Sequence, residues 1–161
     1  MIVVTGAAGF IASFLAQELN QTGRNDLVLV DDFSRKDKEN NHKNIQCHSR
    51  IERTAFIDWF SKNHNKVHFV FHLGARTDTT EMDYSIHETL NVRYSEDIWN
   101  ICSAHNIPLV YASSAATYGM DSVSSGTSDG PTIALLAASA AITPSEWPVP
   151  NFSLSGLNFL D

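Results

Sequence analysis

The segment VTGAAGFIAS, residues 4–13, decides the fold class because a glycine-rich turn joins a short apolar run to an amphipathic one. Gly6 permits a tight turn out of a strand, and Gly9 lets a phosphate group approach backbone N–H groups at the start of a helix. Ala12 is small enough to let that helix pack closely against the strand. The segment therefore predicts a strand, loop and helix that bind the pyrophosphate of a dinucleotide.

An acidic residue at the right distance favours this interpretation over a glycine turn that binds nothing. Asp31 ends the next apolar run, DLVLVDD at 26–32, about 20 residues past the loop, where a carboxylate can accept hydrogen bonds from an adenosine ribose. That arrangement alone favours NAD. Arg35, Lys36 and Lys38 follow at once, and they could bind the 2′-phosphate of NADP or form a solvated charged loop. The sequence leaves NAD and NADP as alternatives.

Outside this unit, strand-like apolar runs alternate with helix-like segments up to Gly119. Strands are expected at 1–6, 26–32, 67–75 and 108–114, and helices at 10–23, 53–63 and 84–105. Strands that are apolar on both faces and separated by helices predict a parallel sheet covered on both sides, with right-handed crossovers. The expected fold class is α/β, an incomplete doubly wound (Rossmann-like) parallel sheet with an irregular C-terminal tail.

The composition changes sharply after this alternating part. All 11 Lys and Arg residues lie before Gly119. The run LLAASAAI at 135–142 could form a short helix, whereas TPSEWPVPNFSLSG at 143–156 has too many prolines and serines for another strand and helix. We therefore expect an NAD(P)-binding domain at 1–119 and an atypical tail at 120–161.

The overall composition argues against several other classes of protein. A net charge of −7 and a pI near 5.4 disfavour binding to nucleic acid. No basic leader and no run of roughly 18 to 20 apolar residues is present, so we expect a cytoplasmic protein without membrane contact. The two cysteines, Cys47 and Cys102, and the seven histidines lack metal-ligand spacing, and His72 is expected to be a packed strand residue.

Motifs along the first 119 residues resemble those of the extended short-chain dehydrogenase/reductases, the NAD-dependent epimerase/dehydratase family. They occur in the family's order and spacing: VTGAAGFIAS, LVDDFS, FHLGARTDTTEMD, NVRYS and YASSAATYG. GARTDTTEMD and YASSAATYG are most similar to the motifs of the family's epimerases of ADP-activated heptose. The resemblance implies epimerisation of a nucleotide sugar through transient oxidation by bound NADP or NAD, in lipopolysaccharide precursor synthesis. A dehydratase or a 4-epimerase is the nearest enzymatic alternative, and a homo-oligomer is compatible with the family.

The resemblance also implies roles for residues at positions that match the motifs. Those implied for the cofactor phosphates are Gly6, Gly9, Phe10 and Ile11. Those implied for the adenosine end are Asp31, Asp32, Lys38 and Arg53. Those implied for the loop beside the cofactor and for support of the active site are Leu73, Gly74, Ala75 and Asn91.

One catalytic residue, Ser114, is implied by the match to YASSAATYG. It corresponds to the serine that hydrogen-bonds the reacting sugar oxygen, and such a hydroxyl stabilises developing charge but does not remove a proton efficiently by itself. The family adds a tyrosine four residues before a lysine, yet the last tyrosine is Tyr118 and the last lysine is Lys66. We expect a catalytically impaired form of the enzyme, its remainder replaced near residue 120 by a frameshift or recombination. The alternatives are a noncatalytic NAD(P)-binding module and a nonfunctional product with an exposed sheet edge.

Overall fold

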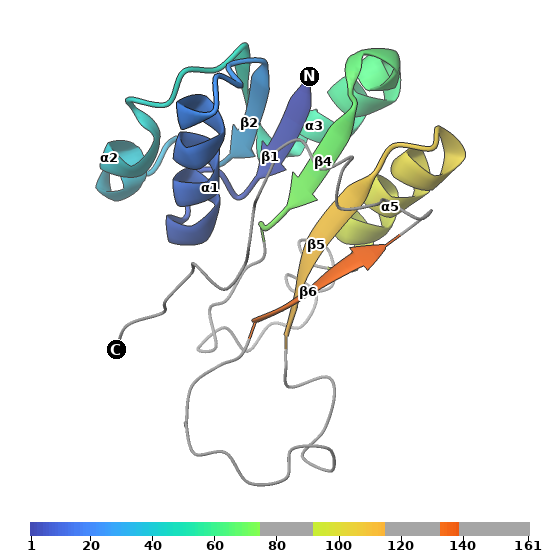
Figure 1. Cartoon of the computed structure of the whole chain (residues 1–161). Helices are drawn as coiled ribbons and strands as arrows, with labels where there is room; N and C mark the ends of the chain where they lie inside the picture. Colours follow the sequence, from blue (N-terminus) through green and yellow to red (C-terminus); the bar gives the residue numbers. More distant parts are fainter. Residues whose placement is uncertain (75–91, 115–132, 139–161) are drawn as a thin grey trace, which may run out of the picture.

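A six-stranded sheet flanked by helices forms the framework of the chain (Figure 1). The computed structural model describes residues 1–74, 92–114 and 133–138. The spatial order of the strands is β3-β2-β1-β4-β5-β6. Their bounds are β1 Ile2–Thr5, β2 Leu27–Asp31, β3 Ser49–Glu52, β4 Phe69–His72, β5 Leu109–Ser114 and β6 Ile133–Ala138. Strands β1 to β5 are parallel and β6 is antiparallel to β5, which confirms the predicted Rossmann-like α/β class.

The helices lie on both faces of this sheet. Their bounds are α1 Phe10–Gln21, η1 Lys36–Lys38, α2 Glu39–His42, α3 Arg53–Asn63, η2 His64–Lys66 and α5 Tyr94–Ala104. Helix α1 packs on one face, and α3 and α5 pack on the other, as Figure 1 shows. None of the helices in the described part of the chain is long and apolar enough to cross a membrane.

Two hydrophobic clusters, one on each face, hold the layers together. Along β1 the side chain of Val4 joins the cluster under α1, and that of Val3 joins the cluster under α3 and α5. Phe56 and Phe60 of α3 are fully buried in the second cluster, and their rings stack at 5.2 Å between centroids. The strands are therefore apolar on both faces, as a sheet covered by helices on both sides requires.

Helices α1 and α3 agree closely with the expected ranges. Helix α3 has the predicted bounds, 53–63. Helix α1 ends at Gln21, and Gly23 follows with φ +85°, a left-handed conformation that closes a helix at little cost in glycine. For the helix expected at 84–105, the structure describes the chain from residue 92, and 84–91 lie outside the described residues.

Two strands correct the sequence prediction. Strand β3 was not expected, because SRIE alternates half-buried and exposed residues at the sheet edge and so lacks an apolar run. The expected helix within 135–142 is wrong at its start, because Ile133–Ala138 forms β6 and pairs with β5 from Ser114↔Ile133 to Leu109↔Ala138. Pairing with an open strand edge outweighs the helix propensity of the alanines, and it covers the β5 edge that the alternative of a nonfunctional product would leave exposed.

Candidate functional site

The carboxyl ends of β1 and β4 mark the point at which the strand order of the sheet reverses. From β1 the chain passes through α1 to β2 on one side, and it later crosses back through α3 to β4 on the other side of β1. The loops after β1 and β4 therefore leave the sheet on opposite faces. In open parallel sheets, ligands bind in the crevice at such a switch point.

Gly6 brings these two loops into contact. Its φ of +72° is left-handed, and a Cβ atom added to it would lie 2.6 Å from the Cα of Gly74. A Cβ added to Gly74 would in turn lie 2.9 Å from the backbone nitrogen of Gly6. Backbone atoms cannot yield as a flexible side chain would, so the loops after β1 and β4 approach each other only because both positions are glycine.

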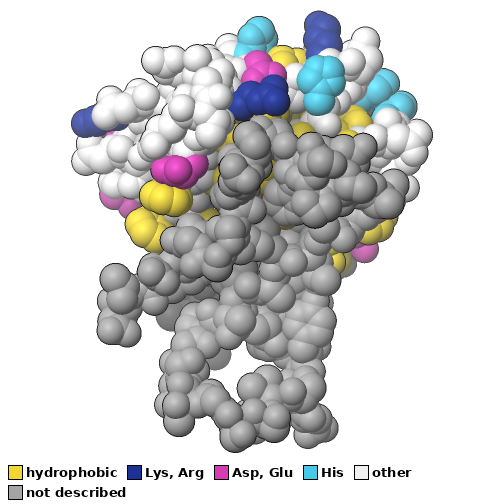
Figure 2. Space-filling view, viewed as in Figure 1, with side chains coloured by type: hydrophobic (Ala, Val, Ile, Leu, Met, Phe, Trp, Pro, Cys, Tyr) yellow, Lys and Arg dark blue, Asp and Glu magenta, His cyan; other side chains and the backbone are white. Residues whose placement is uncertain are grey.

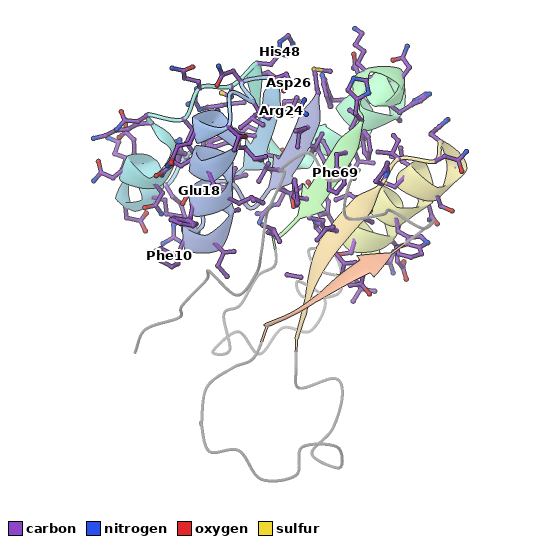
Figure 3. The ribbon with its side chains drawn as sticks, viewed as in Figure 1. Phe10, Glu18, Arg24, Asp26, His48 and Phe69 are labelled. Atoms are coloured by element: carbon purple, nitrogen blue, oxygen red, sulfur yellow. The ribbon has the colours of Figure 1, made fainter. Side chains whose placement is uncertain are left out.

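The first turn of α1 offers N–H groups to an anion. Gly9 is the N-cap residue and donates its N–H to the carbonyl oxygen of Gly6 at 2.7 Å. No side chain caps the helix, and its first turn holds no acidic residue. Phe10 and Ile11 lie in that turn, and Figure 3 shows Phe10 at this end of the helix. Free N–H groups and the positive end of the helix dipole suit a pyrophosphate, so the loop fits a dinucleotide.

Asp31 braces the glycine loop from the end of β2. Its Oδ2 accepts the N–H of Ala8 at 2.8 Å, and its Oδ1 accepts the N–H of Asp32 at 2.7 Å. Asn41 supports the same loop, since its Nδ2 donates to the carbonyl oxygen of Ala8 at 2.9 Å. Each carboxylate oxygen has a second lone pair, so Asp31 can still accept a ribose hydroxyl. Sequence reasoning missed Asn41, because a polar residue in a short helix carries no motif.

Charged groups of both signs surround the end of β2. Hydrogen bonds from Ser34 hold the pKa of Asp32 below its usual range, and the charges of Arg53 and Arg35 act in the same direction. Arg35 itself pairs with Asp37, with Nη2 and Oδ2 2.7 Å apart. Arg53 begins α3, next to Glu52, the residue that pairs with Asp31 across the sheet. Its buried Nε has no hydrogen-bond partner among the described residues, so a donor is available there.

The expected site residues fall into three groups in the structure. Seven of them lie in or beside the loops after β1 and β4 or at the end of β2: Gly6, Gly9, Phe10, Ile11, Asp31, Leu73 and Gly74. Three others flank that edge from the segments after β2 and β3: Asp32, Lys38 and Arg53. Ala75 and Asn91 lie outside the described residues, and the structure describes only the backbone of Ser114, at the end of β5.

Thr5 and His72 lie beneath the two loops and were not expected to contribute. The Oγ1 of Thr5 is 2.7 Å from the Nδ1 of His72, and the Nε2 of His72 is 2.8 Å from the Oγ of Ser95. Burial lowers the pKa of His72 to about 4, so the ring is neutral at pH 7. His72 is packed within the sheet, as expected, but it is also hydrogen-bonded on both sides. The contact between Thr5 and His72 depends on the register of β1 with β4, two strands far apart in sequence, so no local sequence pattern predicts it.

Histidines also gather at the amino ends of the strands, away from the glycine loop, and Figure 2 shows several of them together. The rings of His64 and His105 stack with centroids 3.6 Å apart, and with His68 they line a cavity of about 350 Å³. Lone pairs of parallel stacked rings do not converge on one ion. In the part of the chain that the structure describes, no group of three or more His, Cys, Asp or Glu residues could hold a metal.

A second cavity, of about 470 Å³, lies between α5 and β5. His72, Ser95, Glu96, Trp99 and Tyr111 line it. The rings of Trp99 and Tyr111 meet edge to face, with centroids 6.4 Å apart. Three of its lining side chains are aromatic, namely His72, Trp99 and Tyr111.

A glycine loop at the switch point of a parallel sheet, an uncapped helix start and an acid at the end of β2 are together typical of dinucleotide-binding α/β proteins. The sequence profile of the NAD dependent epimerase/dehydratase family matches residues 2–137, and the chain belongs to this family.

Curated relatives narrow the similarity. The chain is 42% identical over 119 residues to an ADP-L-glycero-D-manno-heptose-6-epimerase of Cupriavidus pinatubonensis, a match that covers 73% of this chain and 36% of that protein. It is 38% identical over 122 residues to the Fusobacterium nucleatum protein of the same name, which covers 74% of this chain and 37% of that protein. The matched part of the chain thus spans little more than a third of these relatives.

Solved structures agree in fold. The Helicobacter pylori ADP-L-glycero-D-manno-heptose-6-epimerase superposes with a TM-score of 0.64 at 24% identity, over 80% of this chain and 43% of that one. A UDP-glucuronic acid 4-epimerase from Bacillus cereus, solved in complex with NAD, gives the same TM-score and identity over 81% of this chain and 45% of that one. At this identity the superpositions show the fold alone.

Proposed function

We propose that the chain binds NAD or NADP at the glycine loop, as part of the machinery that epimerises an ADP-activated heptose. The observation that carries the proposal is the loop itself: Gly6 and Gly74 in contact at the switch point, beside an uncapped α1 and a braced Asp31. The 42% identity to a heptose epimerase supports the choice of substrate. Such a reaction draws on the cell's pools of dinucleotide and nucleotide sugar, so the proposed location is the cytoplasm.

Each part of the site has a definite task in this proposal. The first-turn N–H groups of α1 hold the pyrophosphate, Asp31 accepts a ribose hydroxyl, and Arg53 and Lys38 meet the adenosine end. When bound, the nicotinamide would take a hydride from the sugar and return it. Ser114, at the carboxyl end of β5, would hydrogen-bond the sugar oxygen at which this happens.

The choice between the two dinucleotides depends on opposing charges at the end of β2. Asp31 and Asp32 favour a ribose hydroxyl and repel a 2′-phosphate, whereas Arg53 and Lys38 attract one. Arg35 contributes less, because its guanidinium is already paired with Asp37. We propose that the site takes both dinucleotides, and that NADP binding is the more sensitive to salt because it relies on these cations.

The chain alone is proposed to bind cofactor without turnover. No Tyr-x-x-x-Lys follows Ser114 in the sequence, so the usual proton-transfer pair of the family is missing from this chain. This observation favours the alternative of a noncatalytic NAD(P)-binding module, which makes the same prediction about binding. If the chain is part of the epimerising machinery, a partner that supplies the missing tyrosine and lysine should restore activity. If the chain is a noncatalytic NAD(P)-binding module, such a partner should not.

Calorimetric titration of the purified chain with NAD and with NADP, at low and high salt, tests the proposal. Saturable binding of both, with the steeper salt dependence for NADP, is expected. Incubation with the ADP-heptose substrate and NAD, followed by NMR of the sugar, should show no epimerisation. Absence of binding by both dinucleotides would refute the proposal, and turnover would refute the claim that this chain binds without catalysis.

A further inference from the structure

The cavity of about 470 Å³ between α5 and β5 has no ligand in the proposed function. None of the described residues that line it belongs to the glycine loop or to the end of β2. Leu109 contributes apolar surface, Trp99 and Tyr111 contribute aromatic rings, and Glu96 and Asn100 contribute polar groups. Concave sites that are mostly apolar, with a few polar groups, are typical of small-molecule binding.

Trp99 lies on the open side of α5. The helix is anchored to the sheet through Ile98 and Cys102, which are buried in the second hydrophobic cluster. Trp99 keeps 41% of its surface exposed and is absent from the described members of both clusters. Packing of the core therefore does not account for a tryptophan at this position, and its ring is accessible to a ligand.

The rings of Trp99 and Tyr111 stand at a right angle to each other. Their planes meet at 87°, with the centroids 6.4 Å apart. The face of an aromatic ring carries partial negative charge, and it attracts a cation that lies within about 6 Å of the centroid. In the angle between two perpendicular rings this close together, one alkylated ammonium group can lie over both faces.

The charges at the cavity also favour a cation. Glu96 is the one carboxylate among the described residues that line it, and no Lys or Arg is among them. His72 is neutral at pH 7, because burial lowers its pKa to about 4. Trp99 and Asn100 follow Glu96 by three and four residues on α5, so all three lie on one side of the helix. A cation held by the rings therefore has an anion beside it.

We propose that this cavity binds a small, free organic cation with an alkylated ammonium group, between the rings of Trp99 and Tyr111 and beside Glu96. The proposal is independent of cofactor binding at the glycine loop. Aromatic faces suit such a cation because its methyl groups pack against the rings while its charge is attracted to them. Choline is a fitting probe, since it carries this group and a hydroxyl that the amide of Asn100 can hydrogen-bond.

Titration of the parent chain with choline chloride, followed by NMR of the tryptophan indole N–H groups, tests the proposal. Sodium chloride is lowered as choline chloride rises, so that ionic strength stays constant. The indole signal of Trp99, assigned as the one that Trp99→Phe lacks, should shift and saturate. The neutral alcohol in which carbon replaces the choline nitrogen has the same shape and should bind at least about fivefold more weakly. Equal binding of the alcohol and choline would overturn the preference for a cation.

Substitutions on α5 separate the cavity from the general charge of the helix. Trp99→Leu keeps an apolar side chain without an aromatic face and should weaken choline binding about tenfold. Glu96→Gln should weaken it about threefold, since the carboxylate is exposed. Asp97→Asn is the matched control: Asp97 is an exposed acid in the same helical turn that does not line the cavity, and its loss should change the affinity less than about twofold. Equal losses for Glu96→Gln and Asp97→Asn would overturn the role of Glu96.

Glycerophosphocholine distinguishes a free cation from the headgroup of a lipid. Its phosphate adds a negative charge close to that of Glu96, so it should bind more weakly than choline. Tighter binding than that of choline would identify a headgroup and overturn the assignment to a free cation. If choline leaves the Trp99 signal unshifted, the cavity is not the proposed site, whatever the titrations with NAD and NADP show.

Discussion

At Gly6 two independent constraints select glycine. The backbone φ of +72° disfavours any residue with a Cβ, and the space that a Cβ would fill is already taken by the backbone of Gly74. Gly23 shares only the first constraint, because its φ is +85° and an added Cβ would have no neighbour within 4 Å. A comparison of Gly6 with Gly23 therefore distinguishes the cost of backbone strain from the cost of steric crowding.

Alanine at these two positions should have different costs. We expect Gly23→Ala to lower the free energy of unfolding by about 1 kcal/mol through strain alone. Gly6→Ala should lower it by about 3 kcal/mol or more, because two strand-end loops must also move apart. Urea unfolding of both variants gives the comparison. Equal losses would show that the contact between Gly6 and Gly74 costs nothing to open.

His72 makes stability depend on pH. Its pKa falls from about 6.5 in the unfolded chain to about 4 in the fold, because burial disfavours the charged ring. Between these values the unfolded chain binds a proton that the folded chain does not. The stabilisation is therefore complete above about pH 6.5 and is lost as the pH falls toward 4, by up to about 3 kcal/mol. Burial and the charge of Arg50 lower the pKa of His42 as well, which adds to the same trend.

Urea unfolding between pH 7.5 and about pH 4 measures this dependence. His72→Gln keeps a polar side chain but does not titrate, so its unfolding free energy should fall less steeply over this range. His68→Gln, at an exposed position just before β4, is the matched substitution for comparison. A slope that survives the loss of His72 would assign the pH dependence to other groups.

At the scale of elements, α3 carries a fully buried phenylalanine, whereas α1 carries one that is partly exposed. Phe60 is 0% exposed between α3 and the sheet, whereas Phe14 of α1 is 44% exposed. Phe60→Ala should lower the free energy of unfolding by about 3 to 5 kcal/mol, by lost transfer energy and the cavity left behind. Phe14→Ala should cost about 1 kcal/mol or less. Similar losses in urea unfolding would mean that α3 is not anchored through Phe60.

The elements that sequence predicted are those whose pattern is local. The runs that became β1, β2, β4 and β5 are apolar because they are covered on both faces, and α3 shows a helical spacing of aromatics. Strand β3 has one half-exposed face, and β6 is a strand because an antiparallel partner is available to it. Neither cause is visible in the segment itself.

The candidate site divides in the same way. Gly6, Gly9 and Asp31 could be predicted as site residues from sequence because their spacing is fixed by one strand, one helix and the next strand. Thr5 and His72 are 67 residues apart and meet through the register of β1 with β4, while Asn41 reaches Ala8 from a short helix after β2. Their roles are tertiary, so only the folded chain brings them to the loop.

At the scale of the whole molecule, cofactor binding and stability are linked. A ligand that binds only the folded chain raises the free energy of unfolding, by about 2.7 kcal/mol at a hundredfold excess over its Kd. The glycine loop, Asp31 and Gly74 come from three different strands, so a dinucleotide held there would tie β1, β2 and β4 together. NAD should therefore stabilise the sheet as a unit and not the loop alone.

Gly9→Ala tests this linkage. An added Cβ at Gly9 would lie 3.0 Å from the carbonyl oxygen of Gly6 and would stand where the pyrophosphate approaches α1, so NAD affinity should fall at least about tenfold. At a fixed NAD concentration, NAD should raise the free energy of unfolding of this variant by about 1.4 kcal/mol less than it raises that of the parent. The rise in Tm on adding NAD should be correspondingly smaller. Gly23→Ala, which adds the same methyl group far from the loop, should start from a lower Tm yet gain as much from NAD as the parent does. If NAD stabilises Gly9→Ala as strongly as it stabilises the other two chains, the dinucleotide binds elsewhere, and the glycine loop is a structural turn.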